Sequence, residues 1–145
     1  MRLVIYGALA AVVAVVLVAR SSGGPETVEL QGRTTRGEAV ELKLVDGRLE
    51  SFDLHTGVTC PKLKVWHGWK WAAKGPFGGE GARFEYGDRN RFPDGGRFIS
   101  VMRGRVTDGG SGARGTIDTR GTWPTESGRT ACRSSLAFEA SEKGG

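Results

Sequence analysis

Histidine and cysteine are scarce in this chain of 145 residues, which contains only two of each. Nucleophilic catalysis by serine or cysteine needs a basic partner for the nucleophile, and only His55 and His67 are available for that role. The sequence has no G-x-S-x-G element, and nothing in the spacing of its 16 acidic residues selects a pair for glycoside hydrolysis. We therefore expect a protein that is not an enzyme.

Closely spaced metal ligands are also missing. A structural zinc site draws on ligand pairs such as C-x2-4-C, whereas no two of His55, Cys60, His67 and Cys132 are closer than five residues. The glycine-rich segment 108–112 lacks the lysine and the following helix of a phosphate-binding P-loop. We expect no metal and no cofactor, and we interpret segment 108–112 as a hairpin turn.

Helical periodicity is absent after residue 24, and no fixed-period repeat occurs. The chain contains 24 glycines, and each glycine inside a helix costs about 1 kcal/mol relative to alanine. This composition favours strands and turns. Removing residues 1–24 leaves 121 residues, which is enough for one domain and too few for two.

One long apolar run lies at the N-terminus. Leu3–Ala19 is uncharged over 17 residues and is flanked by Arg2 and Arg20. It suits either the apolar region of a signal peptide, with a cut after Gly23, or a short membrane-spanning helix. We expect residues 1–24 to be a signal peptide or transmembrane anchor with a spacer. Residues 25–145 are then an exported domain, either secreted or anchored outside the cytoplasm.

Export would place the two cysteines in an oxidising compartment, where disulfides form. With only Cys60 and Cys132 in the chain, a single intramolecular bond is available. The alternative is a pair of separate buried thiols. We expect the disulfide.

Alternation of apolar and polar residues predicts short strands joined by glycine and aspartate turns. Asp46-Gly47 is a strong hairpin signal, and the uneven apolar spacing after it predicts a β-bulge near Glu50-Ser51. Residues 61–82 are expected to be irregular, and 88–96 a polar turn. The expected strands are 27–33, 38–44, 48–55, 83–86, 97–107, 113–123 and 130–140.

These elements predict an all-β domain of about seven to eight antiparallel strands. A β-sandwich and a small barrel both fit such a pattern, preceded in the chain by the N-terminal signal or anchor helix. The disulfide would join the end of the third strand to the last strand.

The segment 62–74 combines tryptophans and lysines and contains no acid. Aromatic faces with flanking cations bind sugars or polyanions, or lie at membrane interfaces. Alternatively, the indoles fill the core while the lysines extend outward. In an extended segment Trp66 has the opposite phase to Trp69 and Trp71, so we expect at least one exposed indole. The candidate surface-binding residues are Trp66, Trp69, Trp71, Lys62, Lys64 and Lys70.

Several short motifs resemble those of small secreted or membrane-anchored bacterial proteins of the actinomycete type, which carry one β-domain of unknown function. The motifs are Gly32–Thr34 with Val40–Leu44, Gly47-Arg48, Cys60, Gly96–Phe98, Arg103–Val106 with Ala113–Thr116, and Cys132. The resemblance implies export and a β-domain, and it carries no catalytic residue to this chain. The tryptophan-rich segment 66–71 departs from the group.

The net charge of the exported part indicates which kinds of partner to expect. The exported part has 19 basic and 16 acidic residues, a balance of +3, which suits an anionic cell envelope. Nucleic acid is not expected as a partner outside the membrane. The sequence thus predicts a non-catalytic envelope protein that contacts wall polymer or another envelope protein, and the membrane through Leu3–Ala19 if this segment is not cleaved. The alternative is a small secreted enzyme or ligand-binding protein with an unrecognised site.

Overall fold

The computed structural model describes residues 26–143, and the expected signal or anchor lies outside the described residues. Within this range no helix is long and apolar enough to span a membrane. The strands are β1 (Thr27–Thr34), β2 (Ala39–Val45), β3 (Arg48–Cys60), β4 (Val65–Lys74), β5 (Arg83–Arg91), β6 (Arg97–Thr107), β7 (Gly112–Thr125) and β8 (Gly128–Glu142), and a 3-10 turn occupies Asp108–Gly110.

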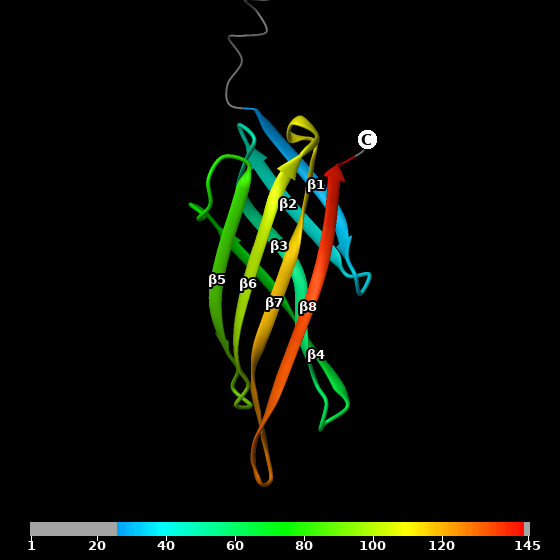
Figure 1. The fold of residues 1–145 in the computed structure, drawn as a ribbon, viewed down its shortest axis with the longest axis vertical. Helices are drawn as coiled ribbons and strands as arrows, with labels where there is room; N and C mark the ends of the chain where they lie inside the picture. The colour runs from blue at the N-terminus through cyan, green and yellow to red at the C-terminus, as the bar shows by residue number, and fades with distance from the viewer. Residues whose placement is uncertain (1–25, 144–145) are drawn as a thin grey trace, which may run out of the picture.

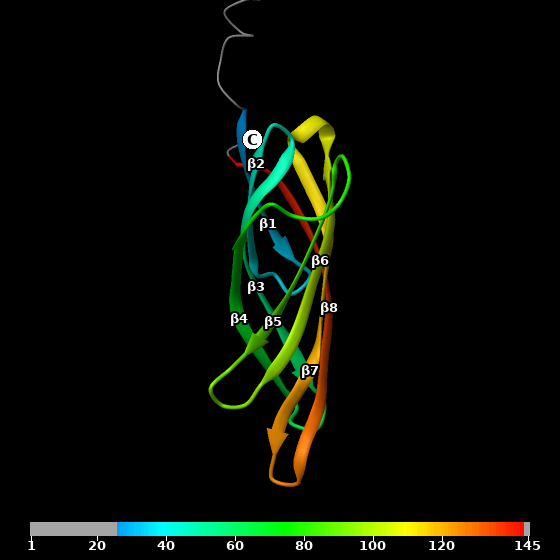
Figure 2. The ribbon, with the colours of Figure 1, turned by 90° about the vertical axis from the view of Figure 1, so that its left-hand side faces the viewer.

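All eight strands belong to one antiparallel sheet with the order β4-β3-β2-β1-β8-β7-β6-β5. The sheet curls on itself into a narrow, elongated barrel (Figures 1 and 2). Among the described strands, β4 and β5 are the two edges and form no ladder with each other. The predicted all-β class is confirmed, and the curled sheet forms a small barrel.

The β1–β2 hairpin is shorter than β3 and β8, so these two longer strands can also pair with each other. Beyond the β1–β2 turn, β3 pairs directly with β8 through Thr59 and Arg133. The predicted disulfide between Cys60 and Cys132 is present at this seam, with the two Cα atoms 4.3 Å apart. Both cysteines are buried, beside Val58 and Phe98. The bond therefore joins the two halves of the chain within a small apolar cluster.

The predicted hairpin and bulge in the first half of the chain are confirmed. Asp46 and Gly47 adopt positive φ angles of 51° and 76°, as a tight hairpin turn requires. Lys43 pairs with Ser51 while Leu44 pairs with Leu49, so Glu50 is the extra residue of a bulge. The bulge lets β3 keep its apolar residues on the core side of the sheet.

The expectation of irregular structure at 61–82 and 88–96 is wrong in part, because a long piece of the first segment and the start of the second belong to strands. Segment 65–74 is a continuous strand that pairs along its whole length with β3. The strand expected at 83–86 continues to Arg91, because β5 pairs with β6 over all nine of its residues. The alternation signal is weak there because the inward positions are partly polar: Asn90 donates a hydrogen bond to Ser100 Oγ at 3.3 Å.

Side chains from both halves of the sheet fill the barrel. Phe52 packs against Trp71 and Tyr86, with ring centres 4.9 and 5.6 Å apart. Gly104 and Gly115 face each other on β6 and β7, and a Cβ on Gly115 would lie 2.8 Å from Phe138 Cζ. Glycine is needed there because the aromatic core approaches the backbone closely. The largest fully buried side chains are Phe138, Leu30, Leu44, Leu54, Met102 and Ile117.

Candidate functional site

The outer face of β5–β8 carries a groove of about 820 Å³. Its lining residues lie toward the end of the barrel at which the β5–β6 and β7–β8 turns are found (Figure 1). Five arginines line this groove, together with the exposed Ile99 and with Pro61, which follows β3. No acidic residue lines it. The arginines are Arg89, Arg91, Arg97, Arg120 and Arg133. We call this surface the arginine groove.

The strand register explains why these arginines gather on one face. Alternate residues of a strand point to the same side of a sheet, and neighbouring strands are aligned so that the arginines fall opposite one another. Arg91 pairs with Arg97 across β5 and β6, and Arg120 pairs with Arg133 across β7 and β8. Arginines separated by up to 44 residues in the chain thus line the same groove.

The charges of the arginine groove are not compensated by carboxylates. None of the five side chains forms an ion pair or a side-chain hydrogen bond with the described part of the chain. Directly opposed like charges destabilise a sheet, and this groove contains two such pairs. The arrangement therefore favours binding of an external anion.

The acids close to this region have other partners. Asp118, one position further along the outer face of β7, accepts a hydrogen bond of 2.7 Å from Ser135 Oγ. On the inward side of β5, Asp88 interacts with Tyr86. Burial, the negative charge of Asp88 and the hydrogen bond to it all raise the pKa of the Tyr86 phenol.

A rigid framework supports the arginine groove. The Arg129 side chain donates hydrogen bonds to Thr122 Oγ1 at 2.7 Å and to the carbonyl oxygen of Gly95. It therefore clamps the β7–β8 hairpin to the β5–β6 turn. On the core side, Phe98 and Cys132 belong to the cluster that surrounds the disulfide, so the backbone beneath the groove is fixed by covalent and apolar contacts.

Trp71 is not a surface residue, which corrects the expectation from the sequence. Only 3% of it is exposed, and it contacts Phe52 and Tyr86 in the core. Trp69 faces the same side and is half-buried, with ring centres 5.0 Å from Phe92 and 5.3 Å from Phe98. Alternate residues of a strand point to the same side of the sheet. Both indoles therefore point into the barrel, where they pack against other aromatic rings.

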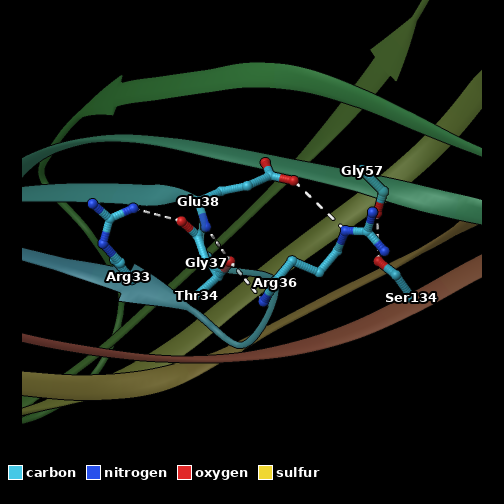
Figure 3. A network of polar contacts seen from close by, with 7 residues as sticks. All are labelled: Arg33, Thr34, Arg36, Gly37, Glu38, Gly57 and Ser134. Atoms are coloured by element: carbon cyan, nitrogen blue, oxygen red, sulfur yellow. Dashed lines mark hydrogen bonds and ion pairs between the residues drawn. The ribbon is translucent and has the colours of Figure 1, made fainter.

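Trp66 takes the outward phase and lies over Gly57, where a Cβ would be 2.7 Å from its ring. The guanidinium of Arg36, from the β1–β2 turn, lies 3.8 Å from the Trp66 ring centre. Arg36 also pairs with Glu38 at 3.6 Å, and beside it Ser134 donates a hydrogen bond to the Gly57 carbonyl (Figure 3). This half-buried indole therefore already contacts a cation of its own chain. The contact holds the β1–β2 turn close to the place where β3 pairs with β8.

The three candidate lysines are exposed and do not form one surface with the inward tryptophans. Lys70 forms an ion pair of 3.1 Å with Asp53. Lys62 and Lys64 lie in the β3–β4 turn, which begins at Pro61 on the edge of the arginine groove. The two turn lysines therefore extend the positive charge beside the groove.

The arginine groove was missed from the sequence although a compositional signal exists. Residues 83–142 contain ten arginines and no lysine, while five of the six lysines lie between 43 and 74. Each arginine alone is typical of an exposed strand position. Only the pairing of four strands brings five of them to one groove.

The described residues contain no group of three or more potential metal ligands. No family model matches the chain, and no match was found among the curated proteins or the solved structures. The resemblance to small exported bacterial β-domains therefore stays a prediction.

Proposed function

We propose that this protein is a non-catalytic binding domain that holds oxyanion groups in the arginine groove. The observation that carries the proposal is the presence of five arginines and no acid around one hollow of the outer face. Guanidinium groups bind phosphate and carboxylate oxygens through two parallel hydrogen bonds, which a lysine ammonium does not provide. An anion in this groove would offset the repulsion within both arginine pairs.

The proposed setting is the cell envelope, with the domain exported and either released or held by the N-terminal segment. The domain would contact an anionic envelope polymer there. The net charge of +3 in residues 25–145 supports this setting, as does the disulfide. The unequal distribution of arginine supports it further, because it concentrates positive charge on one half of the sheet.

Calorimetric titration of the full chain in a non-ionic detergent tests the proposal, with tripolyphosphate as the probe. We expect saturable binding that weakens with added salt. The double substitution R120Q/R133Q should abolish this binding. The matched control R48Q/K74Q removes the same charge from exposed positions on β3 and β4 and should bind like the unaltered chain. Equal losses in both variants, or no binding by the unaltered chain, would show that the groove is not an anion site.

A further inference from the structure

A second group of arginines lies on the same outer face, nearer the other end of the barrel. Arg83, Arg105 and Arg114 stand side by side on β5, β6 and β7, and all three are exposed. They line a hollow of about 410 Å³, together with Arg103 and with Glu139 of β8. We call this surface the upper arginine row.

The charge of the upper arginine row remains positive after its internal contacts are counted. Arg103 forms an ion pair of 3.4 Å with Glu85, and Glu139 lies opposite Arg114. Three arginines thus face one remaining carboxylate. Arg83 and Arg105, like Arg105 and Arg114, are directly opposed like charges and repel each other.

The two arginine surfaces are aligned along the strands. On β6, the distance from Ile99 in the arginine groove to Arg105 is six residues, or about 20 Å at the usual rise of a strand. Between them on the outer face, β5 and β6 present the uncharged pair of Gly87 and Val101 and then the ion pair of Glu85 with Arg103, whose two charges cancel. The intervening Asp118 lies on β7, to the side of this track.

We infer that the ligand is an extended linear polyanion that lies along β5 and β6 and contacts both arginine surfaces at once. This inference rests on the proposed function and names its ligand class. A single small anion would need only one hollow. A flat lipid surface is disfavoured because both arginine sets line recesses in the surface. The shared chemistry is an unbranched chain with oxyanions along its length.

Simultaneous contact has a measurable consequence. Once one part of the chain is bound in the arginine groove, the next part is held near the upper arginine row at a high effective concentration. Affinity should therefore rise with chain length beyond the roughly 20 Å that separates the two surfaces. A chain too short to reach both should bind in the arginine groove, which no acid lines. It should therefore be insensitive to the upper arginine row, where Glu139 offsets part of the positive charge.

The experiment compares tripolyphosphate with long-chain polyphosphate, using the full chain in a non-ionic detergent. We expect the long chain to bind about 10²-fold more tightly, with affinity expressed per phosphate. The substitution R105Q/R114Q should reduce long-chain affinity to that of tripolyphosphate and leave tripolyphosphate binding unchanged. R48Q/K74Q is again the control, and thermal melting verifies that each variant is folded.

Equal affinity for short and long chains, or no effect of R105Q/R114Q on the long chain, would overturn the inference. The proposed function would survive that result provided that tripolyphosphate still binds and R120Q/R133Q still abolishes binding. Polygalacturonate, a carboxylated chain, separates the two sources of oxyanions: the polymer that shows the R105Q/R114Q effect is the chemistry the surface prefers. Binding to micelles containing phosphatidylglycerol, without binding to either polymer, would replace the linear polyanion by a membrane surface.

Discussion

Arg120 and Arg133 lie directly opposite each other on β7 and β8, and both line a groove that contains no acid. Neither has a carboxylate partner among residues 26–143. Such a pair lowers the stability of a sheet, so the two arginines do not hold the barrel together. Their placement is what the proposed binding of an external anion requires.

Removing this pair should leave the free energy of unfolding unchanged or raise it. We expect R120Q/R133Q to stabilise the domain by roughly 0.2–1 kcal/mol, since like-charge repulsion across the strands disappears. Urea unfolding at low ionic strength, followed by tryptophan fluorescence, measures the change. A loss of more than about 1 kcal/mol would mean that the arginines stabilise the fold.

The tryptophans of β4 should differ in their effect on stability. Trp71 is buried among aromatic rings, so Trp71→Ala should cost about 3–5 kcal/mol. Trp66 is half-buried on the outer face, and its contact with Arg36 is worth about 0.5–1 kcal/mol. Trp66→Ala should therefore cost clearly less. Equal losses in the two urea unfolding curves would contradict the assignment of Trp66 to the outside.

The disulfide should supply a large part of the stability. Cys60 and Cys132 are separated by 72 residues, and the chain-entropy relation gives about 4 kcal/mol for a loop of that length. We expect the double substitution of both cysteines by alanine to lower the free energy of unfolding by about this amount. Adding a reductant to the variant should then have no further effect, whereas the unaltered chain should lose stability on complete reduction.

Tyr86 should make the domain less stable in alkali. Its pKa in the folded protein is raised above 10.0, first by burial and then by Asp88. The folded state therefore holds the phenol proton more tightly than the unfolded state. This contribution is complete below pH 10.0 and is lost as pH rises through the folded pKa.

Tyr86→Phe isolates this effect from the titration of lysines. The free energy of unfolding of the unaltered chain should fall more steeply above pH 10.0 than that of the variant. Absorbance of the phenolate in the folded protein should also appear later than in urea. Parallel stability curves for the two proteins would show that Tyr86 ionises equally in both states.

The sequence predicts those strands whose inward residues are apolar. In β2 and β3 the period of two and the Asp46-Gly47 turn are local properties of the chain, and the bulge at Glu50 follows from the apolar spacing alone. The pairing of the disulfide also follows from the sequence, because only two cysteines exist. In β5 the inward Asn90 hides the alternation, since its polar contact with Ser100 is made by a residue of another strand.

The sequence by itself determined the all-β class, the strong hairpin and the single possible cystine bond, because each depends on local pattern or on counting. Only the tertiary structure decided which charges become neighbours. Arg91 faces Arg97 and Arg120 faces Arg133 because the sheet aligns these strands in a particular register, and a shift of one residue would turn such side chains to the other face. Register arises from the packing of the whole core, so no single segment of the sequence contains the arginine groove.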